Sequence, residues 1–307
     1  MAKICSYCGY TASDESRFCS NCGKEFINNV VCPGCGRQHG ANDRFCPYCG
    51  RPTDGTAAPQ SPTTQRTQPT SNDVVGTPVD FNVCGIAFRM IPVAGGTFVM
   101  GAGLMDLAHA NNDETPAHQV TVDSFMIGET EVTQELWYAV MGKNPSHYRN
   151  VDNLPVDHVS WDDCQEFIQK LNALTGQSFR LPTEAEWEFA ARGGNLSHGY
   201  KYSGSDIIDE VAWYDYNSDE QTHPVGTLQP NELGLYDMTG NVWEWCQDRY
   251  GEYSDKPQVN PKGPDRGWDR VYRGGGEGEF DNDCRVTVRS SDPCYSDSNL
   301  VGLRLAL

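Results

Sequence analysis

The stretch FRLPTEAEWEFAARGG, residues 179–194, decides the fold of the larger part of this 307-residue chain. Its Thr-Glu-Ala-Glu run at 183–186 is a capping box, in which the threonine and the second glutamate satisfy free backbone N–H groups where a helix begins. The glycine pair at 193–194 predicts that this helix ends near Ala191. With 31 Gly and 14 Tyr in the chain, we expect short helices within a loop-rich body that aromatic side chains stabilise.

The neighbouring segments predict more elements of the same kind. Residues 87–101, AFRMIPVAGGTFVMG, indicate a strand, a Gly-Gly turn and a second strand. Thr133 can cap a helix at 134–141, and Ser160 can cap a longer helix that continues to Leu174. Long irregular stretches separate these elements. Something other than regular hydrogen-bond ladders must therefore hold the body together.

The net charge of −19 is distributed unevenly. Residues 79–307 hold 16 Lys and Arg against 36 Asp and Glu, whereas residues 1–50 carry a net charge of +1 and residues 51–78 are neutral. A body this acidic repels phosphate backbones, so we expect no nucleic-acid partner. Cations or basic peptides suit it better.

Eight of the 13 cysteines lie in the first 50 residues, as four Cys-x2-Cys pairs that form two sets 27 residues apart. Two intervening residues let both sulfurs of a pair face one ion, and a glycine after each second cysteine allows a tight turn. Tetrahedral sulfur ligation favours zinc over hard cations. The predicted ligands of two structural zinc ions are Cys5, Cys8, Cys19, Cys22, Cys32, Cys35, Cys46 and Cys49.

This pattern resembles the double zinc-ribbon modules of bacterial and archaeal proteins. Disulfides, redox-active Cys-x2-Cys motifs and an iron–sulfur site are the competing interpretations. A 50-residue segment with few aliphatic residues buries too little surface to fold alone, so metal binding is expected to supply its folding energy. No coordination position is evidently open, which favours a structural element that docks to another protein or to its own chain.

Residues 51–78 are rich in Pro, Thr, Ser and Gln and are expected to form a disordered linker between the tandem ribbons at 1–50 and the body at 79–307. The N-terminal MAKICSYCGY has no apolar run typical of a signal peptide, and no apolar run of about 18 residues predicts a membrane span. We therefore expect a cytoplasmic protein without membrane contact, in a compartment where thiols stay reduced.

Seven segments of the body resemble, in order, the formylglycine-generating enzyme family, also called sulfatase-modifying factors, and suggest a bacterial member. They are IPVAGGTFVMG (91–101), ETPAHQVTVDSFMIGETEVTQELW (114–137), PVDHVSWDDCQEF (155–167), FRLPTEAEWEFAARGG (179–194), GLYDMTGNVWEWCQD (234–248), VYRGGG (271–276) and NLVGLRL (299–305). The resemblance implies an α+β fold of low regularity, related to C-type lectin domains and commonly containing calcium.

The resemblance also implies a calcium loop. The family ligates calcium through a first side chain, two backbone carbonyls and a final carboxylate, which correspond here to Asp237, Gly240, Val242 and Glu244. All four supply the hard oxygen donors that calcium requires. The alternative is that both acids are ordinary turn and surface residues. A second family site upstream looks shortened here, near residues 217–223, and is not carried over.

The family's aerobic oxidases bind Cu(I) through two cysteines, with four residues between them, after the Gly-Gly turn. Counted without gaps from Gly274 and Gly275, Cys284 occupies the second cysteine's position and Glu279 replaces the first. If a gap is placed earlier, Cys284 matches neither cysteine. A carboxylate cannot replace a thiolate toward Cu(I), so no copper is expected. Cys284 remains a weak catalytic candidate that could pair with Cys294; its alternative role is packing before a strand at 285–289.

Three functions stay open. The first is a calcium-stabilised, lectin-like binding module that presents a loop face to a protein or peptide partner. In one variant of this function, the sequence of residues 276–299 differs among related proteins. The second is a formylglycine-generating oxidase with an altered thiol site, and the third is a regulatory scaffold whose ribbons recruit the partner. The predicted ligand face consists of Glu277, Glu279, Asp281, Asn282, Asp292, Tyr295 and Asp297. We expect the first function and no active oxidase.

Overall fold

The structure is a computed structural model of the chain, and it divides into two compact units, Met1–Thr63 and Thr64–Leu307. The described parts are four short strands within residues 3–40 and, in the larger unit, residues 76–103, 109–149, 151–297 and 300–307. The boundary between the units falls inside the stretch expected to be a linker, and the eight predicted zinc ligands lie outside the described residues.

The four strands of the smaller unit form two antiparallel pairs. β1 (Lys3–Ile4) pairs with β2 (Thr11–Ala12), and β3 (Asn29–Val31) pairs with β4 (Gln38–Gly40). Ile4 lies opposite Thr11 and Val31 lies opposite Gln38, so the backbone repeats the 27-residue spacing of the cysteine sets. Each pair flanks the first Cys-x2-Cys motif of its set.

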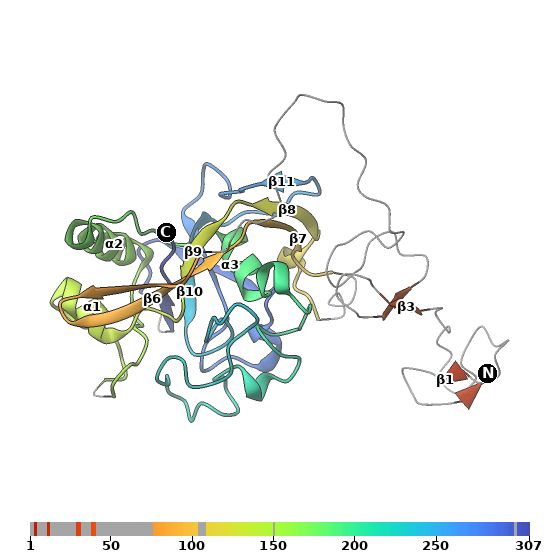
Figure 1. Ribbon diagram of the computed structural model, residues 1–307, viewed down its shortest axis with the longest axis horizontal. Helices are drawn as coiled ribbons and strands as arrows, with labels where there is room; N and C mark the ends of the chain where they lie inside the picture. Colours follow the sequence, from red (N-terminus) through yellow and green to blue (C-terminus); the bar gives the residue numbers. More distant parts are fainter. Residues whose placement is uncertain are drawn as a thin grey trace. The chain divides into compact units, whose positions relative to one another are not determined.

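In the part of the larger unit that the structure describes, the strands form three small sheets (Figure 1). The first contains β5 (Val79–Val83), β6 (Ile86–Val93) and β9 (Phe125–Gly128), and the second contains β7 (Gly96–Met100), β8 (His118–Val122) and β11 (Gln258–Val259). The third has the order β13 (Arg289–Pro293), β12 (Asp269–Arg273), β10 (Trp243–Arg249), β14 (Val301–Leu303). The strands expected on both sides of the turn in residues 87–101 are confirmed, but β6 and β7 join different sheets.

The three predicted helices are also confirmed: α1 (Gln134–Met141), α2 (Trp161–Thr175) and α3 (Glu184–Ala191). The capping box of α3 is complete, because Thr183 Oγ1 accepts from the Glu186 N–H at 3.2 Å and Glu186 Oε2 accepts from the Thr183 N–H at 2.8 Å. The described residues of the body also form four short 3₁₀ helices: η1 (Asn112–Glu114), η2 (Gly194–Leu196), η3 (Ile208–Glu210) and η4 (Asp281–Cys284). The body therefore has the mixed α+β fold with few helices that the sequence predicts.

One expected strand is wrong. Residues 285–289 were predicted as a strand, but β13 begins only at Arg289. Arg285 instead turns into the interior, where Nη1 and Nη2 each lie 2.7 Å from a Glu114 carboxylate oxygen, and its carbonyl accepts from the Val288 N–H at 3.0 Å. The segment is thus shaped by a buried ion pair and a turn.

Buried arginine–glutamate pairs answer the question of what holds so irregular a body together. Glu244, Glu188, Glu114 and Glu184 are each at most 5% exposed, and each contacts an arginine that is at most 4% exposed. The pairs are Arg304–Glu244, Arg273–Glu188, Arg285–Glu114 and Arg289–Glu184. They accompany an apolar core whose largest members are Trp137, Trp187 and Trp245.

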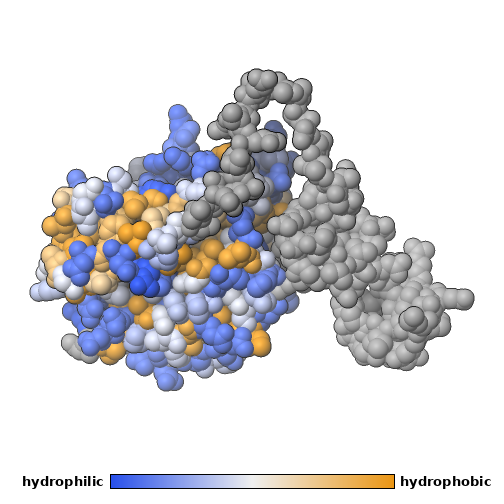
Figure 2. All heavy atoms as spheres, viewed as in Figure 1, coloured by the Kyte–Doolittle hydropathy of each residue, from blue (hydrophilic) through white to orange (hydrophobic). Residues whose placement is uncertain are grey.

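The face of the larger unit drawn in Figure 2 mixes hydrophilic and apolar residues, with apolar ones gathered toward the end that carries α1 and β6 in Figure 1. None of the helices in the described part of the chain has the length and apolar character needed to cross a bilayer.

Candidate functional site

Cys284 lies against the Gly-Gly turn that follows β12. A Cβ atom added to Gly275 would lie 2.6 Å from Cys284 Sγ, so a glycine is required where the thiol packs. Cys284 is fully buried in a small cluster with Tyr202, Val211 and Tyr214. Burial, followed by the charge of Glu279, raises the pKa of the Cys284 thiol well above its usual range. This thiol is therefore protonated and shielded from solvent.

Glu279, which the ungapped count aligns with the first family cysteine, is fixed by neighbouring groups. Its Oε1 accepts from the Trp243 indole N–H at 3.1 Å, and its carbonyl accepts from the Asp215 N–H at 3.0 Å. Cys294 does not join Cys284, because it packs beside the main apolar cluster and both residues are free thiols. Within the described residues, Cys284 thus has no second thiol beside it.

Glu277 was expected in the exposed ligand face, but its side chain is buried. Its side chain is only 6% exposed, its N–H donates to the Asn241 carbonyl at 2.9 Å, and its carbonyl accepts from the Ser218 hydroxyl at 2.9 Å. Burial and the nearby carboxylates of Asp157 and Glu220 raise its pKa. Glu277 therefore lies beneath the predicted ligand face.

The other members of the predicted face fall into two groups. Asp281 and Asn282 belong to η4 and lie near Lys201, whose Nζ is 3.7 Å from Asp281 Oδ2 and 3.5 Å from Asn282 Oδ1. Asp292 lies on β13, and beyond it Tyr295 is 72% exposed and Asp297 is also exposed.

Two aromatic rings connect these groups. The Trp243 indole, which binds Glu279, has its ring 5.1 Å from that of Tyr272, and the Tyr272 hydroxyl lies 3.5 Å from Asp292 Oδ2. The structure therefore brings Glu279 and Asp292 to the same side of the β10–β12–β13 sheet.

Exposed aromatics at this face were missed by the sequence reasoning. Phe280 is 57% exposed and Tyr216 is 75% exposed, with ring centroids 6.5 Å apart. Large aromatic side chains are costly to leave in water, so exposed pairs of this kind are typical of binding surfaces. The sequence signal was present, since Phe280 stands alone among glycines and acids in GGGEGEFDND.

The predicted calcium loop is buried. Asp237 is 4% exposed, and its Oδ2 accepts from the Gly226 N–H at 2.7 Å. Burial raises the pKa of Asp237 to about 6. A Cβ at Gly240 would lie 2.2 Å from the Trp213 carbonyl oxygen, so the turn requires glycine, and Val242 is completely buried.

Glu244 does not fit the role of an uncommitted calcium ligand. Its Oε1 is 2.6 Å from Arg304 Nη2, and its Oε2 accepts from the Trp187 indole N–H at 2.7 Å. Arg304 Nε lies 3.0 Å from both carboxylate oxygens. Arg304 thus already balances the negative charge of Glu244, which the sequence analysis expected a calcium ion to balance.

Glu131 offers a donor that the sequence reasoning did not consider. It is 2% exposed, its Oε2 accepts from Asn241 Nδ2 at 3.3 Å, and its Oε1 has no hydrogen-bond partner. Burial, followed by Asp237, raises the pKa of Glu131 well above its usual range. Unpartnered buried oxygens suit a hard cation, although no group of three His, Cys, Asp or Glu side chains in the described part is arranged to hold a metal.

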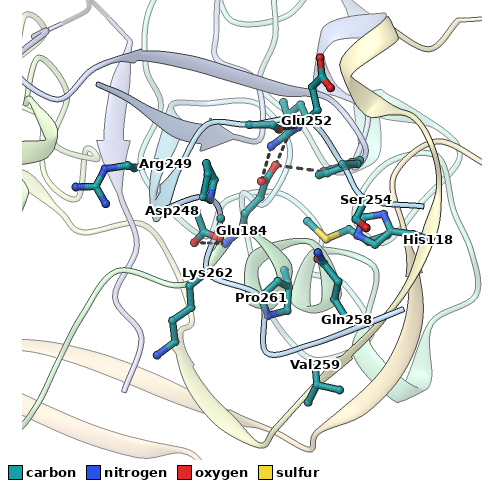
Figure 3. A pocket seen from close by; sticks show the side chains of 17 residues that line it. His118, Glu184, Asp248, Arg249, Glu252, Ser254, Gln258, Val259, Pro261 and Lys262 are labelled. Carbon is teal, nitrogen blue, oxygen red and sulfur yellow. Dashed lines mark hydrogen bonds and ion pairs between the residues drawn. The ribbon is translucent and has the colours of Figure 1, made fainter. Parts of the chain in front are cut away.

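A separate polar cavity of about 490 Å³ lies where β10, the loop after it and the start of α3 meet. Figure 3 shows His118 and Gln258 on one side of this cavity and Asp248 and Lys262 on the other. None of its lining residues belongs to 276–284. Burial, with the charge of Glu184 next, raises the pKa of Asp248 to about 8, while the Glu184 N–H donates to Asp248 Oδ2 at 3.0 Å.

This shift makes stability depend on pH. Between about pH 4 and pH 8 the folded protein keeps a proton on Asp248 that the unfolded chain has lost, so the free energy of unfolding falls as pH rises through that window. We expect Asp248→Asn to reduce the fall by on the order of 5 kcal/mol over this window, because the amide stays neutral and each unit of the pKa shift corresponds to about 1.4 kcal/mol. Urea unfolding of both proteins at about pH 4 and about pH 8 measures this difference. If the free energy of unfolding changes equally with pH in the wild type and in Asp248→Asn, the assignment to Asp248 is contradicted.

The comparisons with known proteins agree with this fold. A family model described as "Sulfatase-modifying factor enzyme 1-like domain" matches residues 86–307. The chain belongs to this family. A second model, "Double zinc ribbon", matches residues 5–50 and suggests zinc in the N-terminal segment.

Relatives of this sulfatase-modifying factor family member have different names. The "Formylglycine-generating enzyme" of Streptomyces coelicolor is 31% identical, covering 70% of this chain and 88% of the relative, and "Chaperone protein LppX" of Paenibacillus barcinonensis is 35% identical, covering 60% and 78%. Among solved structures, "Treponema denticola variable protein 1" has 31% identity and a TM-score of 0.68, covering 75% of this chain and 99% of that one. PvdO from Pseudomonas aeruginosa has 26% identity and a TM-score of 0.63, covering 74% and 97%.

Proposed function

We propose that the body of this protein is a ligand-binding module and not a copper oxidase. The observation that carries the proposal is the state of Cys284: it is fully buried and its thiol pKa is raised, and by an ungapped count Glu279 replaces the first of the two cysteines that the family's oxidases use. Cu(I) chemistry requires two soft thiolates at one ion. A neutral, shielded thiol beside a fixed carboxylate does not supply them.

The ligand surface is the loop region that carries Glu279, Phe280, Asp281 and Asn282, together with Asp292, Tyr295 and Asp297. Exposed aromatic rings beside carboxylates suit a ligand with a cationic or basic group, because the rings supply contact area and the acids supply charge. The net charge of −20 over residues 79–307 favours the same class of ligand. We therefore place a protein or peptide partner with exposed Lys or Arg at this face.

The likeness to a structure titled "variable protein" supports one form of the proposal, in which the loop residues differ among related chains. Residues 276–299 would then vary while the Arg–Glu pairs stay fixed. The zinc ribbons add a second docking element in this arrangement. A pull-down with residues 1–50 compared with residues 79–307 separates a partner of the ribbons from a partner of the loop face.

The oxidase remains the second candidate because relatives with 29–31% identity carry the name formylglycine-generating enzyme. Oxygen uptake with a Cys-x-Pro-x-Arg peptide and added Cu(I) distinguishes the two functions. We expect no uptake above that of the Cys284→Ser variant. Uptake that disappears in this variant would establish the oxidase and overturn the binding-module proposal.

Calcium is part of the proposed architecture. The Asp237 carboxylate, the unpartnered Glu131 oxygen and the backbone carbonyls of Gly240 and Val242 would hold the ion, since all are oxygen donors. The ion would offset the negative charge that Arg304 leaves uncompensated among Glu131, Asp237 and Glu244. Its role is to stabilise the loop between β10 and residues 226–237.

Metal analysis of the purified full chain tests these assignments together. We expect two zinc ions, at least one calcium ion and no tightly bound copper, with calcium lost in Asp237→Asn and in Glu131→Gln but retained in Cys284→Ser. Removal of calcium should lower the melting temperature of the wild type and leave that of Asp237→Asn unchanged. Equal calcium content in the wild type and both acid variants would exclude the site.

A further inference from the structure

A hollow of about 430 Å³ on the body is bordered by three arginines, Arg249, Arg266 and Arg270. Trp268, which is 80% exposed, forms part of its wall, and Asp265, Gly267 and Cys294 complete the lining. Residues 79–307 contain only 16 Lys and Arg against 36 Asp and Glu, so three arginines around one hollow form a local reversal of charge. We call this feature the arginine hollow.

The strand register places two of these cations together. Arg249 on β10 lies directly opposite Arg270 on β12, and residues that face each other across strands have side chains on the same side of the sheet. Like charges in such positions repel each other. Asp292 flanks Arg270 on β13, but its carboxylate is near the Tyr272 hydroxyl, and none of the three arginines forms an ion pair within 4 Å of another described residue.

Backbone contacts hold both guanidinium groups in place. Arg249 Nε donates to the Gly267 carbonyl at 3.1 Å, and Arg270 Nη1 donates to the Gln247 carbonyl at 2.8 Å while its Cζ lies 3.7 Å from the centre of the Trp161 ring. The remaining N–H groups of both side chains have no acceptor among the described residues, and they are not buried. Oriented donors with free N–H groups are suited to bind an oxyanion.

We propose that the arginine hollow binds a dianionic phosphate group carried on a flat ring. The phosphate balances the charges of Arg249 and Arg270 and accepts from their free N–H groups, with Arg266 at the rim, while the ring covers Trp268. Asp265 in the lining and Asp162 near Arg270 oppose an anion, but the three arginines outnumber them. Charges of the body more than about 8 Å away are largely screened at physiological ionic strength. The site is distinct from the proposed calcium loop and adjoins the acidic ligand face, because Cys294 in its lining lies between Asp292 and Tyr295.

Titration calorimetry of the full chain with phenyl phosphate tests the proposal. We expect saturable binding that weakens at least about tenfold in Arg249→Gln and in Arg270→Gln. Lys170→Gln is the matched control, because Lys170 is an exposed residue of α2 paired with Glu166 and its loss changes the net charge equally. Binding in this control should equal that of the wild type.

Two further probes examine each half of the ligand. Inorganic phosphate should bind more weakly than phenyl phosphate, and Trp268→Ala should weaken phenyl phosphate without affecting inorganic phosphate. Benzoate, a flat ring with one charge, should bind more weakly than phenyl phosphate. The proposal is overturned by no saturable binding of phenyl phosphate, by benzoate binding as tightly, or by equal losses in Lys170→Gln and the arginine variants.

Thermal unfolding of each variant separates lost binding from lost folding. Arg266→Gln provides the safeguard, because this side chain is exposed and forms no ion pair with another described residue. If Arg249→Gln or Arg270→Gln fails to fold, Arg266→Gln must still weaken the binding of phenyl phosphate. Unchanged affinity of Arg266→Gln for phenyl phosphate would refute the site.

Discussion

Arg304→Met should destabilise the body by about 3–5 kcal/mol, because it leaves the Glu244 carboxylate buried without a counter-charge. Arg304 is fully buried and also donates to the Gly128 and Tyr236 carbonyls at 2.9 Å and 2.8 Å. Methionine fills much of the volume but donates to none of these acceptors. The free energy of unfolding from urea titration measures the effect.

The control is the double variant Arg304→Met with Glu244→Gln. Glutamine removes the stranded charge and can still accept from the Trp187 indole N–H, so the double variant should be more stable than Arg304→Met alone. If the single substitution costs less than about 1 kcal/mol, the pair does not hold β14 against β10, and our account of the fold fails.

Arg273→Lys should cost on the order of 3 kcal/mol although it preserves the charge. Arg273 is fully buried, and its Nη1 donates to the Thr287 and Val288 carbonyls at 2.9 Å and 2.7 Å. Its Nη2 donates to the Val286 carbonyl at 3.1 Å and pairs with Glu188. An ammonium group has three donors at one point and cannot span these acceptors, so buried carbonyls lose their partners.

Arg180→Lys is the matched control for this second substitution. Arg180 also binds a glutamate with two nitrogens, at 2.6 Å and 2.8 Å from Glu186, but its side chain is 37% exposed. Water can replace the lost contacts there, so we expect a cost below about 1 kcal/mol by the same urea measurement. If Arg273→Lys and Arg180→Lys lower the free energy of unfolding by similar amounts, burial does not make the Arg273 contacts more stabilising than exposed ones.

The helices of the body could be predicted because their signals are local. Thr133, Ser160 and Thr183 cap α1, α2 and α3 through bonds to residues three positions away, which the sequence displays directly. The Arg–Glu pairs could not be predicted in the same way. Glu244 and Arg304 are 60 positions apart, and nothing near either residue selects its partner.

The candidate site was predictable to a similar extent. Spacing from the Gly-Gly turn predicts which family positions Cys284 and Glu279 occupy, and this assignment stays a prediction because it depends on an ungapped count along the chain. Whether Glu277 faces solvent depends on Ser218 and Asn241, which reach it from other segments. Likewise, Arg249 and Arg270 meet only through the β10–β12 register, which includes an irregularity between Trp245 and Arg249.

The pairing of β14 with β10 sets a condition on folding during protein synthesis. Val301, Leu303 and Leu305 are buried, and Ala306 bridges to both Ile127 and Arg180. While a ribosome still holds these residues in its exit tunnel, β10 lacks one neighbour and Glu244 lacks its cation. The body therefore acquires its native packing only after residues 301–306 emerge, long after residues 1–50 have left the tunnel.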